Sequence, residues 1–168
     1  MHSAGSENTH KHNVHNSDAV AIKAGAPCFY DSSKTASDEL GFHVVASDSL
    51  PAAEEGLFCG LATKEIAAGG RGQAMAYGFF QEARIIKMTR AATTDIFASY
   101  SAGAIGDVLD FLTVTGVQAL TRSGAGAATN GGYFALLMET FVSSTTQASG
   151  VNALLTFGDN LKVFVRAL

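Results

Sequence analysis

From residue 19 onward, the sequence consists of short apolar runs separated by Gly, Ser, Asp and Thr. Such runs between turn-forming residues are typical of β-strands, because an amphipathic helix would repeat its apolar residues every three or four positions over a longer stretch. In the last run, Val163 and Val165 alternate with Lys162, Phe164 and Arg166, which predicts a strand with two different faces. We therefore predict an all-β domain, with strands at 26–30, 41–45, 57–63, 73–80, 108–114, 133–138, 152–157 and 161–165. Residues 82–88 favour a strand over a helix, and residues 93–100 are expected to form a short helix.

The two halves of this β domain resemble each other. The segment KAGAPCFYD at 23–31 is similar to AIGDVLDFL at 104–112, since each has a glycine followed by an apolar strand with an acidic residue. Three pairs of residues recur in the same order at a separation of about 80: Gly25/Gly106, Leu61/Leu137 and Gly78/Gly158. This repeat indicates a barrel-like or sandwich domain built from two tandem β units, at about 22–80 and 103–166.

The glycine-rich stretch GLATKEIAAGGRGQAMAYG at 60–78 could be a phosphate-binding loop or a hairpin turn. A phosphate loop of the G-x-G type needs a third glycine and a helix N-terminus, and a strand is expected after Gly72 instead. In the second unit the corresponding turn, 143–150, is rich in Ser and Thr, and Gly, Ser and Thr are all tolerated in turns. We therefore predict a hairpin turn at 67–72. A second G-x-G at 124–126 is interpreted as a loop.

The first 18 residues are polar and rich in His, Asn and Ser, with no hydrophobic period. Such a segment buries too little apolar surface to offset its ordering entropy, so residues 1–18 are predicted to form a flexible arm ahead of a β domain at 19–168. The pair His10-x-His12 invites a metal-binding interpretation, although a disordered arm lacks the fixed geometry of a natural site. An arm of this kind can also become ordered against a neighbouring subunit.

Charge and composition narrow the range of partners. Charged residues are only 15% of the chain and hydrophobic ones 47%, so part of the apolar surface is expected to face a partner. The net charge of -4 gives no general attraction to nucleic acid. No apolar run is long enough for a membrane helix, and no secretory signal is expected. The cysteines Cys28 and Cys59 are interpreted as small buried hydrophobes, with a disulfide between them left open.

No set of residues in the sequence suggests catalysis. A hydrolase needs a nucleophile with a base, and the one histidine beyond the arm, His43, lies in an apolar strand. Aspartates beside turn signals are expected to bond their own backbone, and the same turn role is favoured for the repeat-related glutamates: Asp31, Asp107, Asp110, Asp159, Glu65 and Glu139. Zinc-type and calcium-loop spacings are absent from the sequence. We therefore expect no enzymatic activity, cofactor or metal. The central cations form either a solvated face or a patch for an acidic partner: Arg71, Arg84, Lys87, Arg90 and Arg122.

Three segments of the sequence resemble capsid decoration proteins, also called cement proteins, of tailed bacterial viruses. The segments are IKAGAPCFYD at 22–31, the glycine-rich stretch at 60–78, and TFGDNLKVFV at 156–165. Proteins of this family are small β-barrels or β-sandwiches that sit as trimers on the outer shell, often with an N-terminal arm along the major capsid protein. The resemblance implies a homotrimer on the virion surface, made in the host cytoplasm and bound to the major capsid protein.

On this basis we expect a clamp that stabilises the shell by binding it in one state only. The capsid contact is predicted in the arm, at Asn13, Val14, His15, Asn16, Ser17, Asp18, Ala19 and Val20. The subunit interface is predicted at apolar residues of the central region, namely Phe79, Phe80, Ile85 and Ile86. The alternative is a carbohydrate- or receptor-binding head or fibre module of a virion, against which the absence of Trp counts.

Overall fold

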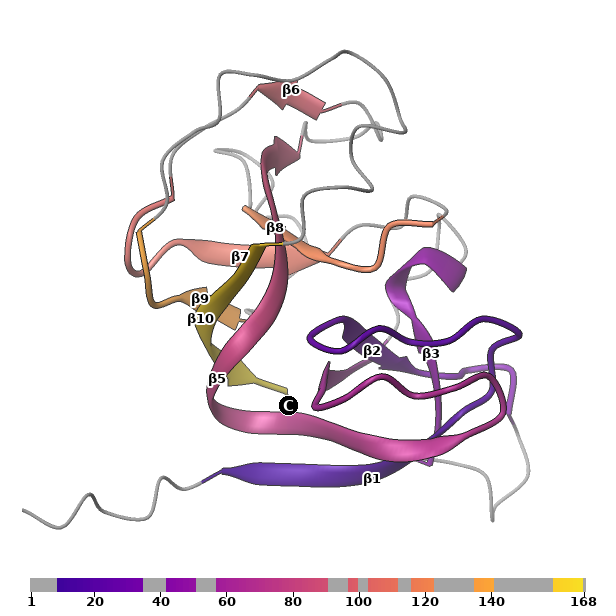
Figure 1. Cartoon of the computed structure of the whole chain (residues 1–168). Coiled ribbons are helices and arrows are strands. Elements are labelled where there is room, and N and C mark those ends of the chain that lie inside the picture. Colours follow the sequence, from indigo (N-terminus) through magenta and orange to yellow (C-terminus); the bar gives the residue numbers. More distant parts are fainter. Residues whose placement is uncertain are drawn as a thin grey trace, which may run out of the picture.

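A computed structural model of the chain (Figure 1) describes residues 9–34, 42–50, 57–90, 97–99, 103–111, 116–122, 135–140 and 159–167. The protein is all-β, as the sequence predicted. The elements in chain order are β1 (His10–Asn16), β2 (Pro27–Tyr30), β3 (His43–Ala46), the 3-10 turn η1 (Ser47–Ser49), β4 (Phe58–Ala62), β5 (Arg71–Arg90), β6 (Phe97–Ser99), β7 (Val108–Phe111), β8 (Leu120–Arg122), β9 (Ala135–Leu137) and β10 (Asp159–Arg166). None of the helical segments in the described ranges is long and apolar enough to span a membrane.

The first five strands pair in a closed ring, so they form a small β-barrel. Along the ring the order is β1, β3, β2, β4 and β5, and β5 returns to β1. The β1–β3 pairing is parallel, while the other four pairings are antiparallel. We call this arrangement the first ring.

A second ring repeats this order of pairing. Strand β5 is 20 residues long, and its second half pairs with β8 and β10 after its first half has paired with β1 and β4. The second ring runs from β5 through β8, β7, β9 and β10 and back to β5. Its β5–β8 pairing is parallel and the others are antiparallel, which matches the first ring strand for strand. In Figure 1 the two rings lie side by side, joined by the long curve of β5. The predicted two tandem β units are therefore confirmed at the level of strand order.

Backbone hydrogen bonds at the entrance to β2 and β7 repeat as well. The amide of Gly25 donates to the carbonyl of Ala62 at 2.8 Å, and the amide of Gly106 donates to the carbonyl of Leu137 at 2.8 Å. Both glycines have positive φ angles, of 74° and 92°. The matched pair Gly25/Gly106 is therefore equivalent in structure, because the same turn carries the chain into the same strand of each ring.

The other two matched pairs are not equivalent. Because Gly25 bonds to Ala62 where Gly106 bonds to Leu137, the counterpart of Leu137 is Ala62, one residue beyond Leu61. Gly78 lies inside β5, whereas residue 158 precedes β10 and lies outside the described residues. The first ring also begins at residue 10, not near residue 22. Loops of unequal length separate the strands, so a single offset of about 80 cannot align all of them.

The predicted flexible arm is wrong for residues 10–16, which form β1. This strand pairs with β3 on one side and β5 on the other, and Val14 and Asn16 are fully buried. The buried amide of Asn16 is satisfied, because its Nδ2 lies 2.8 Å from the carbonyl oxygen of Val20 and its Oδ1 accepts from the amide of Asp18 at 2.9 Å. Ladder hydrogen bonds and a bonded Asn therefore replace the apolar pattern that a buried strand normally shows. Residues 1–8 of the predicted arm lie outside the described residues.

Two clusters of buried side chains fill the fold. One cluster draws small residues from every strand of the first ring and occupies its interior, with Val14, Cys28, Val44, Ala46, Cys59, Ala62 and Ala74 among its members. The other cluster fills the second ring and continues between the rings, where the Phe29 and Phe111 ring centroids are 4.4 Å apart. Buried Gln118 also ties the rings together, because its Oε1 accepts from the amide of Lys23 at 2.8 Å and its Nε2 donates to the carbonyl of Ala21 at 3.1 Å.

The glycine-rich stretch is a turn between β4 and β5, as predicted. Gly69 has a φ of 65°, and the amide of Gly70 donates to the carbonyl of Ala67 at 2.9 Å. The second-unit turn, 143–150, and the loop at 124–126 lie outside the described residues. Residues 82–88 are part of β5, which confirms the favoured strand, and the short helix expected at 93–100 is wrong where the structure describes it, because residues 97–99 are β6.

Candidate functional site

An aromatic strip lies on the outer face of the β5–β10 pair. Tyr77 and Phe79 project from β5, and Phe164 projects from β10, where its backbone is paired with that of Phe79. The Phe164 ring centroid is 5.1 Å from that of Phe79 and 5.2 Å from that of Tyr77. Tyr77 is 44% exposed, and the two Phe side chains are half-buried. The strip is therefore a preformed apolar surface held by edge-to-face ring contacts.

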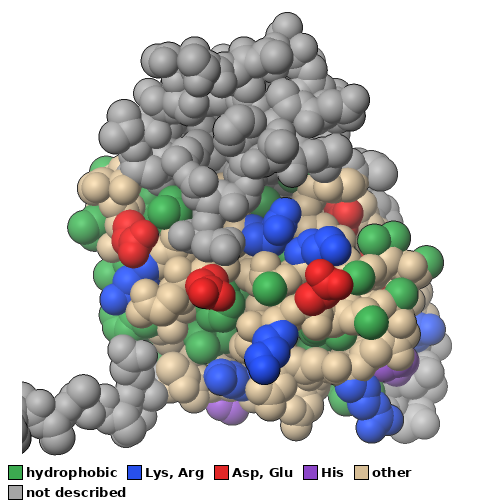
Figure 2. Space-filling model, in the orientation of Figure 1, with side chains coloured by type: hydrophobic (Ala, Val, Ile, Leu, Met, Phe, Trp, Pro, Cys, Tyr) green, Lys and Arg blue, Asp and Glu red, His purple; other side chains and the backbone are tan. Residues whose placement is uncertain are grey.

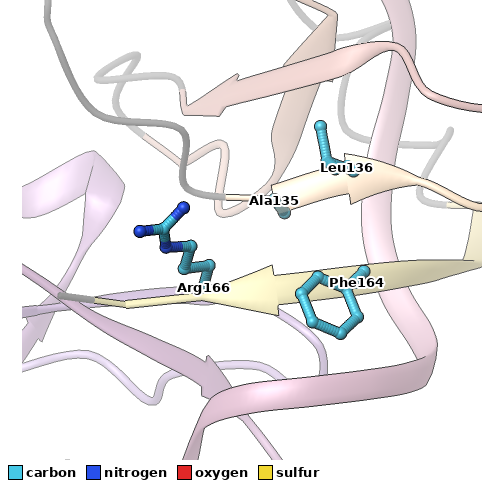
Figure 3. A pocket seen from close by; sticks show the side chains of 4 residues that line it. All are labelled: Ala135, Leu136, Phe164 and Arg166. Atoms are coloured by element: carbon cyan, nitrogen blue, oxygen red, sulfur yellow. The ribbon is translucent and has the colours of Figure 1, made fainter.

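The strip continues into a shallow hollow beside β9 (Figure 3). Ala135 and Leu136 line it from β9, and Phe164 and Arg166 line it from β10. The hollow measures about 240 Å³, which is below the roughly 300 Å³ at which small-molecule pockets normally begin. Lys162 lies over the Phe79 ring, with its Nζ 5.2 Å from the centroid. Cations thus flank an apolar centre, which is an arrangement typical of protein interfaces.

The predicted interface residues fall on both faces of β5. Phe79 lies in the strip. Phe80 and Ile85 are buried core residues, so the prediction that they lie at the subunit interface is wrong. The side chain of Ile86 is not among those described. Adjacent strand residues point to opposite faces, so Phe79 and Phe80 cannot both face outward from a regular strand. The same alternation in the sequence could have identified Tyr77 with Phe79, and Phe164 between Val163 and Val165.

The predicted capsid-contact segment is divided by β1. Val14 and Asn16 are buried and are wrong as contacts. The remaining residues are exposed or half-buried, namely Asn13, His15, Ser17, Asp18, Ala19 and Val20. Of these, Val20 is the exposed large hydrophobic residue, at 55%. The surface contact available here is therefore the turn after β1 rather than an extended arm.

A small polar cluster lies where β1, β2 and β4 meet. The Tyr30 hydroxyl is hydrogen-bonded to His12 Nδ1 at 2.8 Å, and Cys59 Sγ lies 4.0 Å from the same nitrogen. Burial raises the pKa of Cys59 to about 11, so this thiol is protonated at neutral pH. Burial, with a further contribution from Cys59, raises the pKa of Tyr30. A cysteine nucleophile needs a lowered thiol pKa, so this cluster fits packing better than covalent catalysis.

The two cysteines are both free and buried in the first ring. Burial also raises the pKa of Cys28, with a smaller contribution from Cys59. The disulfide left open by the sequence is therefore not formed, and the interpretation of these residues as small buried hydrophobes is confirmed.

The turn role that the sequence predicted is confirmed for Asp31 and Asp107, whereas Asp110 lies within β7 and Glu65 forms a surface ion pair. Asp31 accepts hydrogen bonds from the amide and the hydroxyl of Ser33, and the hydroxyl of Ser17 donates to it at 2.6 Å. Burial alone would raise the pKa of Asp31, but these hydrogen bonds outweigh it and lower the pKa. Asp107 accepts from the amide of Ala104 at 2.7 Å, and Asp110 accepts from the amide of Phe111 at 2.8 Å. Glu65 pairs with Lys23 at 3.2 Å on the surface, and the side chain of Asp159 is not described.

The two central cations with described side chains, Arg71 and Arg84, make separate local contacts. Arg84 Nε donates to the carbonyl of Gln118 at 3.1 Å, and the guanidinium of Arg71 lies over the Phe42 ring at 5.6 Å. The side chains of Lys87, Arg90 and Arg122 are not described. On the face shown in Figure 2, acidic and basic side chains are interspersed among apolar ones. The described part of this face therefore carries charges of both signs.

Comparison of the chain with protein-family models and with curated proteins returns no match.

Proposed function

We propose that this protein acts by surface contact, as a non-enzymatic decoration protein that binds the major capsid protein on the outside of a viral shell. The aromatic strip carries the proposal, because it brings three mutually packed aromatic side chains to the surface with Tyr77 nearly half exposed. Clusters of partly exposed aromatic residues are enriched where proteins bind other proteins. The viral shell and the trimer come from the resemblance of residues 22–31, 60–78 and 156–165 to decoration proteins.

The scaffold under the strip supports a contact function. Both strands that carry the strip are paired along their length in closed rings, and Val163 and Val165 anchor β10 in the core on the opposite face. A strip on such a scaffold loses little conformational entropy on binding, so more of its apolar contact contributes to affinity. A clamp of this kind stabilises the state of the shell that it binds by mass action.

The test uses Tyr77→Asp and Phe164→Ser as disrupting variants and Ile105→Ser as the matched control. Ile105 is 64% exposed, lies in the turn before β7 and is outside the strip. Co-sedimentation with expanded and unexpanded shells of the source virus measures binding, and light scattering measures oligomer size. We expect the wild type and the control to bind expanded shells as trimers, with either strip variant binding about tenfold or more weakly. Unchanged shell binding by both strip variants would contradict the strip as the contact surface.

The same protein samples separate the contact function from the alternative carbohydrate- or receptor-binding module. Phe164 and Arg166 beside the hollow offer a ring face and a hydrogen-bond donor, which are groups that bind sugars. A glycan array probed with the wild type and Phe164→Ser decides between the two functions. Glycan binding that depends on Phe164, without shell binding, would replace the decoration function by the head-module function.

A further inference from the structure

Two histidines from the neighbouring parallel strands β1 and β3 face each other on the surface of the first ring. His15 and His43 are paired in register, and their Nδ1 atoms are 3.3 Å apart. The two rings meet edge to face, with centroids 4.6 Å apart and an interplanar angle of 83°. Strand pairing fixes the backbones of both residues. Because both side chains are half-buried, solvent reaches their ring nitrogens. The strands thus hold two imidazole nitrogens at close range.

The hydrogen bonds of His15 define which of its nitrogens carries the proton. Its Nε2 lies 2.9 Å from the carbonyl oxygen of Gly69, and a carbonyl oxygen can only accept, so Nε2 carries the hydrogen in the neutral ring. The lone pair of Nδ1 therefore points toward His43. Histidines that bind metals nearly always donate their other ring N–H to a carbonyl or carboxylate in this way. Phe42, whose ring lies nearly parallel to that of His15 at 5.9 Å, further restricts the His15 ring.

The nitrogen separation fits a shared metal ion. Zinc binds histidine nitrogen at about 2.0–2.1 Å, so two ligands at a tetrahedral angle lie roughly 3.3–3.4 Å apart. The structure holds the two Nδ1 atoms at 3.3 Å. We propose that His15 and His43 form an open two-histidine site for a divalent transition-metal ion such as Zn²⁺, with water in the remaining positions.

Binding needs both Nδ1 atoms free of protons. His15 already meets this condition. His43 Nδ1 donates to His15 Nδ1 in the structure, so metal binding moves its hydrogen to Nε2 and replaces this hydrogen bond. The neighbouring cation Arg71 lies over the Phe42 ring, and no group of three or more His, Cys, Asp or Glu side chains gathers among the residues described. The site therefore has two imidazole ligands with the Arg71 cation nearby, which predicts weaker binding than at a structural zinc site.

The other close pair of histidines is less suited to this role. His10 and His12 are 4.9 Å apart between ring centroids, but His12 Nδ1 is hydrogen-bonded to the Tyr30 hydroxyl. The metal site therefore differs from the His10-x-His12 pair that the sequence suggests, and the two pairs can be tested separately.

The test is isothermal titration calorimetry of the full chain with Zn²⁺ alone. The variants His15→Gln and His43→Gln remove one ligand each, and a control with His2, His10 and His12 all changed to Gln keeps the proposed pair. We expect one Zn²⁺ per chain in the wild type and the control, and an affinity about tenfold or more lower in each single variant. An unchanged affinity in His43→Gln, or loss of binding in the control, would overturn the proposal.

A second measurement does not depend on the folding of the variants. In the wild type labelled with ¹⁵N at histidine, added Zn²⁺ should shift the Nδ1 resonances of His15 and His43 together. If the Nδ1 resonances of these two rings do not move at saturating Zn²⁺, the proposed site is equally contradicted.

Discussion

Substitution of Gly25 by alanine should destabilise the protein for two separable reasons. The first is its backbone, because a φ of 74° is a left-handed conformation that costs an L-residue about 1–2 kcal/mol. The second is space, because a Cβ atom on Gly25 would lie 2.1 Å from the carbonyl oxygen of Glu82 and 3.0 Å from the amide nitrogen of Arg84. Both are backbone atoms of β5, which no side-chain rotation can move away.

The turn must shift to relieve this overlap, and a shift weakens its contact with β5. The amide of Arg84 donates to the carbonyl of Gly25 at 3.0 Å, so movement of the turn strains the hydrogen bond that fastens it to the strand shared by both rings. Overpacking typically costs about 1–3 kcal/mol, and with the backbone term the expected loss for Gly25→Ala is about 2–5 kcal/mol. The melting temperature of a chain of this size should fall by about 2–4 °C per kcal/mol.

Gly106→Ala is the matched control, because Gly106 occupies the same turn of the second unit. Its φ is 92°, so it shares the backbone cost, but no heavy atom of the described residues lies within 4 Å of an added Cβ. We expect a loss of about 1–2 kcal/mol from backbone strain alone. Urea denaturation followed by circular dichroism gives both values. Equal losses in the two variants would refute the packing of the Gly25 turn against β5.

Three further measurements test the interior of the fold. Cys28 and Cys59 should resist thiol reagents at pH 8 in the native protein and react fully in urea, because burial holds both thiols protonated; rapid native labelling of either cysteine would contradict their burial. Gln118→Leu should cost about 1–3 kcal/mol in urea denaturation, because it leaves the Lys23 amide and the Ala21 carbonyl without their partner, and an unchanged midpoint would exclude this link between the rings. Burial and the charge of His10 lower the pKa of His12 below its ordinary value of 6.5, so the unfolded chain takes up that proton first and stability falls as the pH drops below about 6.5. A His12→Gln variant should therefore lose less stability than the wild type between melts at pH 7 and pH 5. An equal loss in both proteins would show that His12 does not contribute.

The duplication could be read from the sequence because each unit needs the same turn at the same place. Gly25 and Gly106 keep the positive φ that starts β2 and β7, and this requirement leaves a visible glycine in each copy. The exact alignment could not be read, since most strand positions require only an apolar residue. Leu61 and Ala62 are both fully buried, so neither their burial nor their polarity indicates which one corresponds to Leu137.

The strand β1 could not be predicted, because its burial does not depend on apolar side chains. Val14 is its one buried aliphatic residue, and the next inward position is Asn16, whose amide group is bonded to backbone atoms around it. Those partners come from the turns near Val20 and Ile66, which are adjacent only in the folded chain. A method that recognises buried strands by apolar period therefore classifies this segment as a loop.

Only part of the candidate contact surface could be predicted from the sequence. Phe79 belongs to the strip and Phe80 to the core, and strand alternation separates them without a structure. The partner of Phe79 could not be found in this way. Phe164 lies opposite it only because β10 pairs with β5 in one particular register, and that register is interrupted between Leu161 and Val163.

The shared strand explains why the N-terminal segment must be part of the barrel. In the second ring, the position between β8 and β10 is filled by the second half of β5, which has already closed the first ring with its first half. In the first ring, residues 10–16 occupy the equivalent position between β3 and β5. Removal of residues 1–18 would therefore open the first ring and expose its interior, and any loss of shell binding would report unfolding rather than a lost contact. Removal of residues 1–8 alone keeps β1, and comparison with Val20→Asp then measures the surface contribution of this region.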